Sequence, residues 1–264
     1  ILTDLERDEL LANHIDEAAV IRPLLNGEDI YARPDSSPSR WVIDFNEMPI
    51  GQAREFPGSF QRLAELVQPE RAKNNRAARR ERWWIYGENA PGMRQRIAPL
   101  QEMLVITSVS RNIMPIRVPT DLVPSSALIV IATESYAEQA ALSSSAHQLW
   151  AIKWGSGMRT DPRYTPSDIF ETFPRPTPGT NLELLGRELE ATRTEIMARR
   201  GLGITRLYNL VNSPALTNDE DANAIRSLHR SIDQAVMDAY GWNDIQLKHG
   251  FYTYRQMERW TVSP

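Results

Sequence analysis

The chain has 264 residues, of which 41% are hydrophobic and 24% charged, a composition typical of a globular protein with a buried core. It contains no cysteine, which excludes disulfides, thiol catalysis and cysteine zinc sites, and it has no apolar run long enough to span a membrane. The net charge of −4 argues against a generic nucleic-acid binder. Because the first residue is Ile1, we expect the chain to be part of a longer protein.

The charge is distributed unevenly along the chain. Residues 1–50 carry 11 acidic and 4 basic residues, whereas residues 71–117 carry 10 basic and 3 acidic ones. A basic segment on an acidic chain indicates a local surface for a negatively charged partner. Nearly all of these cations are arginine, whose planar fork matches phosphates and guanine edges.

The first 82 residues predict helices around one strand. Residues 2–30 predict a short helix that leaves through Pro23 into a turn at Asn26 and Gly27. A loop is expected over 33–39 and a strand over 40–45, where β-branched and aromatic residues gather. Residues 60–82 lack glycine and predict one helix, with Arg76, Arg79 and Arg80 on one face.

A β-rich centre and a helical end follow. Short apolar runs predict strands over 83–87, 103–110, 114–119 and 127–133, and a helix is expected over 135–155. After a proline-rich linker at 174–180, one helix is expected up to Gly201 and a second from a capping box at Thr217–Glu220 to Gly241. The fold class is therefore α+β: a central mixed or antiparallel β-rich module with flanking helices, followed by a small helical module.

The sequence lacks the common catalytic motifs. It has no phosphate-binding G-x-x-x-x-G-K-[ST], no G-x-S-x-G, no H-E-x-x-H and no Asn-Pro-Pro-Tyr or Asp-Pro-Pro-Tyr tetrapeptide for methyl transfer. The four histidines are scattered singly, which favours surface or core roles over metal binding. We therefore expect no catalysis, cofactor site or metal site in this chain.

Residues 71–82 form the most basic segment. As a functional surface it would contact the phosphates of a nucleic acid, and as an ordinary one it would be a solvated helix face. Trp83, Trp84 and Tyr86 are expected to anchor it in the core rather than to stack on bases. The candidate backbone contacts are Lys73, Arg76, Arg79, Arg80 and Arg82.

Two further segments carry side chains suited to base edges. Arg111 and Asn112 lie at a predicted turn between strands, and arginine pairs with guanine while asparagine pairs with adenine in the major groove. In an extended segment, Arg159, Asp161 and Arg163 would project to one side. An arginine that donates to guanine beside an aspartate that accepts from cytosine could read one G·C pair. The alternatives are a polar hairpin tip and a surface ladder of ion pairs.

These segments resemble a known family. The text "RWWIYGENAPGMRQRIAPL", "LVITSVSRN" and above all "RYTPSDIFETFP" at 163–174 resembles the C-terminal half of the type IIL, MmeI-like restriction–modification enzymes and related single-chain DNA methyltransferases. The resemblance covers nearly the whole chain. It implies a sequence-specific reader of duplex DNA that serves an adenine-N6 methyltransferase using S-adenosylmethionine, with Arg159, Asp161 and Arg163 as base-reading candidates.

The resemblance also implies a division of the chain. We expect a connector from an absent methyltransferase core over 1–50, a target-recognition domain over 51–178 and a C-terminal helical module over 179–264. The expected partners are double-stranded DNA and the N-terminal methyltransferase domain of the same bacterial, cytoplasmic protein, with no membrane. S-adenosylmethionine is expected in the parent protein only, and whether the parent also cuts DNA is open. The alternative is a non-catalytic interaction module whose basic face binds an acidic protein.

Overall fold

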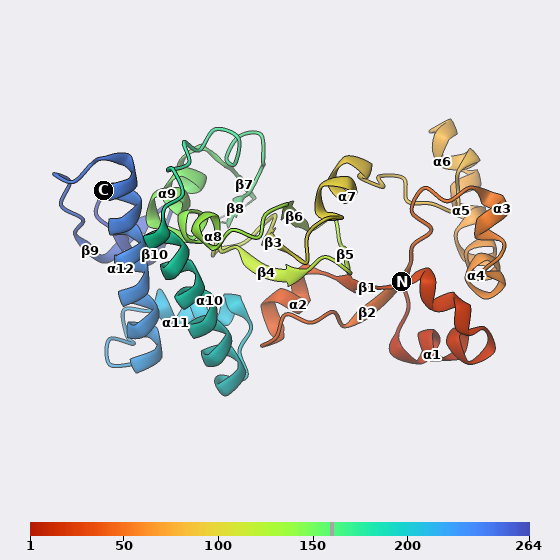
Figure 1. Cartoon of the computed structure of the whole chain (residues 1–264), viewed down its shortest axis with the longest axis horizontal. Coiled ribbons are helices and arrows are strands. Elements are labelled where there is room, and N and C mark those ends of the chain that lie inside the picture. Colours follow the sequence, from red (N-terminus) through yellow and green to blue (C-terminus); the bar gives the residue numbers. More distant parts are fainter. Residues whose placement is uncertain (159–160) are drawn as a thin grey trace. The chain divides into compact units, whose positions relative to one another are not determined.

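The computed structural model describes residues 1–158 and 161–264. The chain forms two compact units (Figure 1), and each is described by itself. Unit 1 comprises Ile1–Leu25, Pro38–Pro99 and Thr120–Val123, and unit 2 comprises Asn26–Ser37, Leu100–Pro119 and Pro124–Pro264. The predicted division at residues 50 and 178 concerns the parts of a longer protein and stays a prediction.

Unit 1 is built on a small sheet with helices around it. β1 (Ile21–Leu25) pairs antiparallel with β2 (Arg40–Ile43), so that Ile21 faces Ile43, and the sheet order is β2-β1-β5, with β5 at Val123–Pro124. The predicted exit through Pro23 is wrong, because Pro23 lies inside β1 opposite Trp41. Buried Ile21, Leu24 and Leu25 hold this segment in the sheet.

The helices of unit 1 are short. A capping box between Thr3 and Glu6 starts the first one. They are α1 (Asp4–Asn13), the 3-10 helix η1 (Ile15–Ala19), α3 (Ile50–Ala53), α4 (Pro57–Leu66), α5 (Gln68–Ala72), α6 (Ala77–Glu81) and α7 (Pro91–Ile97).

The predicted single helix over 60–82 is wrong. Pro69 starts a new helix, α5, and Asn74 ends the run by accepting a hydrogen bond from the Arg76 amide. Residues 83–87, predicted as a strand, form turns instead. Their anchoring role is confirmed, because Trp83 is buried and its ring lies 5.3 Å from that of Phe60.

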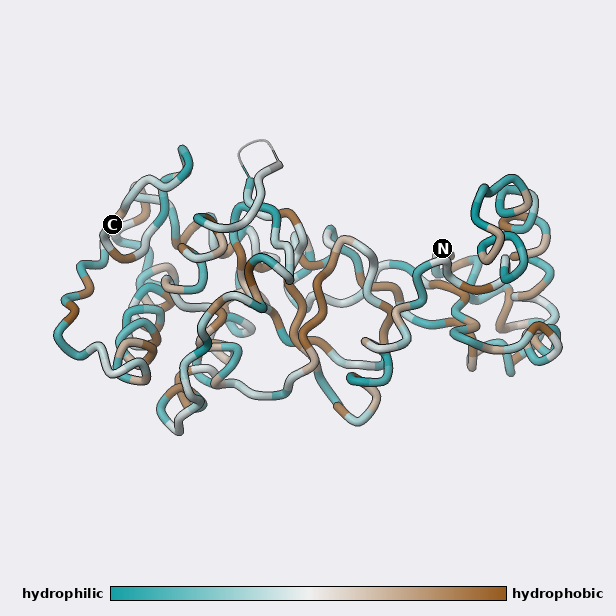
Figure 2. Tube along the Cα trace, turned by 90° about the horizontal axis from the view of Figure 1, so that it is seen from above, coloured by the Kyte–Doolittle hydropathy of each residue, from teal (hydrophilic) through white to brown (hydrophobic). Residues whose placement is uncertain are grey.

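Unit 2 has a three-stranded antiparallel sheet at its centre, as predicted. β3 (Glu102–Thr107) lies between β4 (Ile116–Pro119) and β6 (Leu128–Ile131), with Val105 opposite both Ile116 and Val130. Met103, Leu104, Val105 and Ile106 are wholly buried, which explains the unbroken apolar run. Figure 2 shows brown, hydrophobic stretches along extended parts of the trace, whereas brown and teal alternate along the helices.

Helices surround this sheet. They are α2 (Gly27–Ala32), α8 (Tyr136–Ser143), α9 (Ser145–Trp154), α10 (Thr180–Arg200), α11 (Ile204–Val211) and α12 (Glu220–Tyr240). The predicted helix over 135–155 is two helices, because Ser144 ends α8 and caps α9. Asp219, rather than Thr217, caps α12. The predicted helix ends at Gly201 and Gly241 are confirmed, and both glycines are left-handed.

Two hairpins complete unit 2. One consists of β7 (Ser156–Met158) and β8 (Asp161–Arg163), and the other of β9 (His249–Tyr254) and β10 (Met257–Val262). The α+β class expected from the sequence is confirmed.

Candidate nucleic-acid interface

The β7–β8 hairpin presents the central candidate residues. Ser156 pairs with Arg163 and Gly157 with Pro162 in antiparallel register. Arg159 lies outside the described residues. Asp161 is partly buried and Arg163 is exposed; because they are two apart in one strand, they project to the same side. The extended segment predicted for this charged stretch is therefore confirmed for Asp161 and Arg163.

A buried aromatic cluster fixes the base of this hairpin. Tyr164, Ile169 and Phe173, all from the family-like text, lie in the core of unit 2. The Tyr164 hydroxyl lies 3.0 Å from Nε2 of His147, and Nδ1 of His147 donates to the Leu142 carbonyl at 2.6 Å. Burial lowers the pKa of His147 to about 4, so its ring is neutral at pH 7 and Nε2 accepts a hydrogen bond from the Tyr164 hydroxyl.

Gly155 is required where α9 meets the hairpin. A Cβ atom there would lie 2.4 Å from the Ala151 carbonyl oxygen and 3.1 Å from that of Arg163. Any other residue would displace the last turn of α9 at Ala151 and press on the Arg163 carbonyl of the hairpin. The two ends of the charged segment are thus held by a glycine on one side and a buried tyrosine on the other.

The turn after β3 lies beside this hairpin. Val109 forms a bridge with Arg163, and the Tyr164 amide donates to the Ser108 carbonyl at 2.7 Å. Arg111, two residues further on, is exposed. The structure therefore brings together Arg111, Asp161 and Arg163, which are far apart in the sequence.

Asn112, the fifth base-reading candidate, is placed differently. It is buried, with 6% of its surface exposed. Its amide nitrogen donates to Asn209 at 3.1 Å, and its side-chain oxygen accepts from Asn212 at 2.9 Å. These bonds tie the turn to α11, so contact with a base would require this buried network to open.

The basic segment belongs to unit 1. Lys73, Arg76, Arg80 and Arg82 are exposed, whereas Arg79 is half-buried and pairs with Glu88 at 2.9 Å. Arg76 precedes α6 as its cap residue, so the predicted shared helical face with Arg79 and Arg80 is wrong. Arg80 donates to the Asn74 carbonyl at 2.7 Å. Exposed cations at this density suit contact with phosphates.

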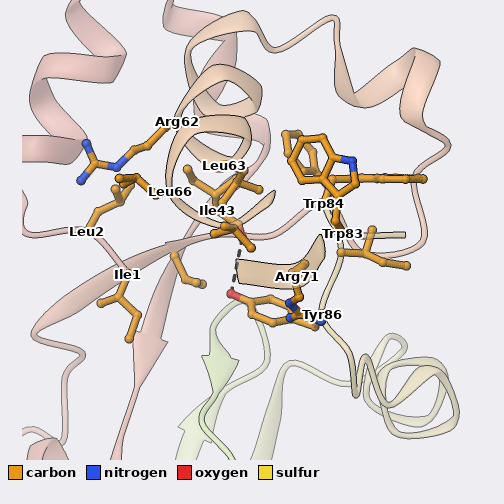
Figure 3. A pocket seen from close by; sticks show the side chains of 14 residues that line it. Ile1, Leu2, Ile43, Arg62, Leu63, Leu66, Arg71, Trp83, Trp84 and Tyr86 are labelled. Carbon is orange, nitrogen blue, oxygen red and sulfur yellow. Dashed lines mark hydrogen bonds between the residues drawn. The ribbon is translucent and has the colours of Figure 1, made fainter. Parts of the chain in front are cut away.

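Unit 1 also contains a cavity of about 230 Å³ (Figure 3). Its lining is apolar except for Arg62, Arg71 and Tyr86, whose hydroxyl donates to the Ile43 carbonyl at 3.4 Å. Trp83 and Trp84 line the cavity as well. Since this lining contains no acid or histidine, it offers neither a general base nor a metal ligand.

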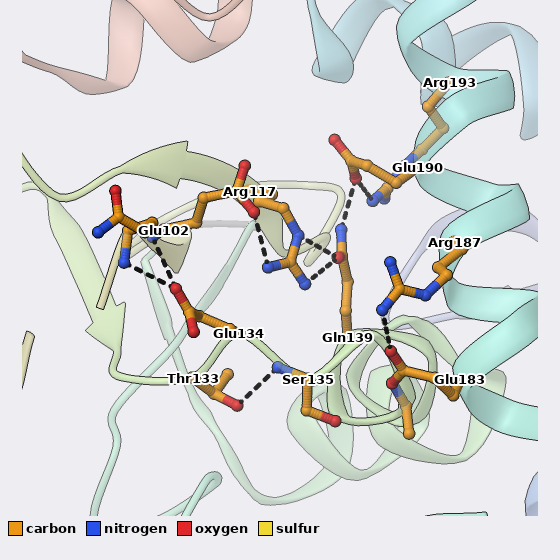
Figure 4. Close-up of polar contacts among 12 residues, drawn as sticks. Glu102, Arg117, Thr133, Glu134, Ser135, Gln139, Glu183, Arg187, Glu190 and Arg193 are labelled. Carbon is orange, nitrogen blue, oxygen red and sulfur yellow. Dashed lines mark hydrogen bonds and ion pairs between the residues drawn. The ribbon is translucent and has the colours of Figure 1, made fainter. Parts of the chain in front are cut away.

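A polar network crosses unit 2 (Figure 4). Arg117 pairs with Glu102 at 3.2 Å and donates to Gln139, which in turn donates to Glu190. Glu190 also accepts from Arg193, which is wholly buried. The network joins the sheet to α8 and α10 and pairs the buried Arg193 with Glu190, which is a structural role.

The described residues contain neither a metal-binding cluster nor a membrane-spanning helix. No group of three or more histidine, cysteine, aspartate or glutamate residues there could hold a metal ion. No helix among them has both the length and the hydrophobicity to cross a membrane.

The chain is similar to known proteins. A family model described as "MmeI, target recognition domain" matches residues 1–177. A solved structure of the type IIL restriction–modification enzyme MmeI in complex with DNA has a TM-score of 0.65 and 20% sequence identity, covering 91% of this chain and 31% of that one. The chain thus spans about a third of that enzyme's length, and no curated protein matches it. With two thirds of its residues matched, the chain belongs to the MmeI target recognition domain family.

Proposed function

We propose that this chain recognises a specific sequence in double-stranded DNA. The observation that carries the proposal is the pairing of the β7–β8 hairpin with the turn after β3, which places Arg111 beside Asp161 and Arg163. A guanidinium and a carboxylate on one extended strand match the acceptors of guanine and the amino group of cytosine. The family to which the chain belongs and the solved DNA complex of MmeI support this function.

The rigid base of this surface also supports base reading. Discrimination between base pairs requires side chains on a fixed backbone, and Gly155 and Tyr164 fix both ends of the segment. Each good base contact contributes about 1–3 kcal/mol of discrimination. Lys73, Arg76, Arg80 and Arg82 would then supply sequence-independent contacts with phosphates, each adding about 0.9 to the salt slope of binding.

We propose further that the parent protein is a DNA methyltransferase that uses S-adenosylmethionine to methylate adenine at N6. The support is the resemblance to type IIL enzymes and the share of such an enzyme that the chain spans. The cofactor and the catalytic residues would belong to a domain outside this chain, which acts where the reader places it. The protein is expected to be cytoplasmic and bacterial.

Methylation mapping tests both levels. Cells that express the full parent protein would be compared with cells that express a charge-exchanged variant, Arg159→Asp with Asp161→Arg. We expect N6-methyladenine in one sequence motif in the wild type and a changed base at one position of that motif in the variant. If the variant methylates the same motif, Arg159 and Asp161 do not read bases. If the wild type methylates no common motif, the proposed function is contradicted.

The alternative is a basic module that binds an acidic protein. The exposed cations of unit 1 favour it as much as they favour DNA. Such a module would lose affinity when Arg76 and Arg80 are neutralised, but it would show no base preference that Asp161 could change.

A further inference from the structure

The C-terminal hairpin β9–β10 lies beyond the part of the chain that the family model matches. It is anchored on α12, because Nε2 of His249 lies 2.9 Å from a carboxylate oxygen of the buried Asp233. The Trp260 ring stacks on His249 with centroids 5.0 Å apart. The hairpin is therefore held firmly at its open end.

Two arginines of this hairpin donate to the two candidate base-reading segments. Nη2 of Arg255 donates to the Gly155 carbonyl at 3.1 Å, immediately before β7. Nη2 of Arg259 donates to the Arg111 carbonyl at 2.7 Å, in the turn after β3. Beside it, the Trp260 amide donates to Asn212, which also holds Asn112. One hairpin thus fixes the backbone of both segments.

Burial of the Arg259 side chain at this place is energetically unfavourable. Only 2% of its surface is exposed, and its Nε and Nη1 are buried with no hydrogen-bond partner among the described residues. An unsatisfied buried donor costs about 1–3 kcal/mol, and more when it is charged. Burial, and after it the charge of Arg111, lower the pKa of Arg259 to about 10, and the charge of Asp161 opposes the change. Its charge is therefore coupled to both candidate readers.

The backbone at Arg255 is strained. It has a φ of 46° and the next residue, Gln256, has a φ of 64°, so the two form a left-handed turn between β9 and β10. Such turns favour Asn-Gly, and an ordinary side chain in this region costs about 1–2 kcal/mol. Strain of this kind is kept where the side chain has a task.

We propose that the β9–β10 hairpin is a positioning element of the base-reading surface, with Arg255 and Arg259 as its positioning residues. This role rests on the proposed function and means that the C-terminal module contributes to sequence specificity. Arg255 holds the start of the β7–β8 hairpin, and Arg259 holds the turn that carries Arg111. Neither side chain contacts DNA; each fixes the backbone from which another side chain does.

The first test uses the double variant Arg255→Asn with Gln256→Gly. The new Asn-Gly turn relieves the strain, so we expect an equal or higher Tm than in the wild type. Because the Gly155 carbonyl loses its donor, the motif selected from a pool of randomised DNA duplexes should be relaxed by about fivefold or more at one position. Gln256→Gly alone is the matched control: it relieves strain, keeps Arg255 and should leave the motif unchanged. If the hairpin is merely structural, the double variant, being at least as stable as the wild type, should select the wild-type motif.

The second test uses Arg259→Lys, which keeps the charge and loses the fork. Hydrogen exchange should become at least about tenfold faster at the amides of Ser110 and Asn112, while the salt slope of binding to the duplex pool stays the same. Unchanged exchange together with an unchanged motif in both variants would overturn the proposal. A wild-type chain that selects no motif would refute the proposed function instead, and the exchange rates would still decide whether the hairpin positions this turn.

Discussion

Replacing Gly155 by alanine should destabilise unit 2 and displace the candidate base-reading hairpin. The added Cβ would lie 2.4 Å from the Ala151 carbonyl oxygen, whereas real Cβ contacts are essentially never shorter than 3.0 Å, so the gap must open by about 0.6 Å. Neither neighbour can rotate away, because Ala151 and Arg163 both present backbone oxygens. Overpacking of this kind costs about 1–3 kcal/mol.

Thermal unfolding of the purified chain measures this cost. At about 2–4 °C per kcal/mol, Gly155→Ala should lower the Tm by roughly 5 °C. Gly92→Ala is the control, because nothing lies within 4 Å of that position inside α7 and alanine favours a helix by about 0.5–1 kcal/mol. If Gly155→Ala melts at the wild-type temperature, the close approach of Gly155 to the Ala151 carbonyl at the end of α9 does not exist as described.

Three further outcomes are expected. Burial lowers the pKa values of His147 and His229 from 6.5 to about 4, so the unfolded chain binds more protons than the folded chain between these values. The free energy of unfolding should therefore fall by about 1.4 kcal/mol per pH unit for each ring as the pH drops from 6.5 to 4. Urea midpoints across that range measure this fall, and a flat profile would contradict it. Asp233→Ala should lower the free energy of unfolding in urea by about 3–5 kcal/mol, because the buried carboxylate accepts hydrogen bonds from Ser145 and pairs with His249. A decrease below about 1 kcal/mol would exclude this role. Gly186→Ala should lower the Tm more than Gly155→Ala, since its Cβ would lie 2.0 Å from the Tyr136 carbonyl oxygen, and an unchanged Tm would mean that α8 and α10 do not approach so closely.

Regular local patterns in the sequence predicted much of the fold. The apolar runs at 103–110, 114–119 and 127–133 became β3, β4 and β6. The central strand β3 is buried on both faces and therefore needs no alternation. Gly201 and Gly241 end their helices in the left-handed conformation, as a glycine without a Cβ permits.

Other features depend on tertiary contacts that spacing does not show. The helix expected over 60–82 breaks before Pro69 and again at Asn74, and Trp83 then packs against Phe60. The β9–β10 hairpin is not evident from the sequence, because its turn, Arg255–Gln256, lacks the glycine or asparagine that marks a hairpin and β9 shows no alternation of buried and exposed residues.

The sequence predicted which residues belong to the candidate site, but not how distant segments come together to form it. The alternation of Asp161 and Arg163 followed from period-two geometry. The bridge from Arg163 to Val109, which brings Arg111 alongside, joins segments about 50 residues apart. The burial of Asn112 depends on α11, a helix that sequence periodicity did not predict.

Selection of duplexes from a randomised pool by the purified 264-residue chain tests the central claim most directly. We predict one enriched motif for the wild type and, for Asp161→Asn, a preference that weakens at one base pair by about 1–3 kcal/mol while the others persist. Binding that depends on salt but enriches no motif would contradict sequence recognition and favour a basic surface for an acidic partner.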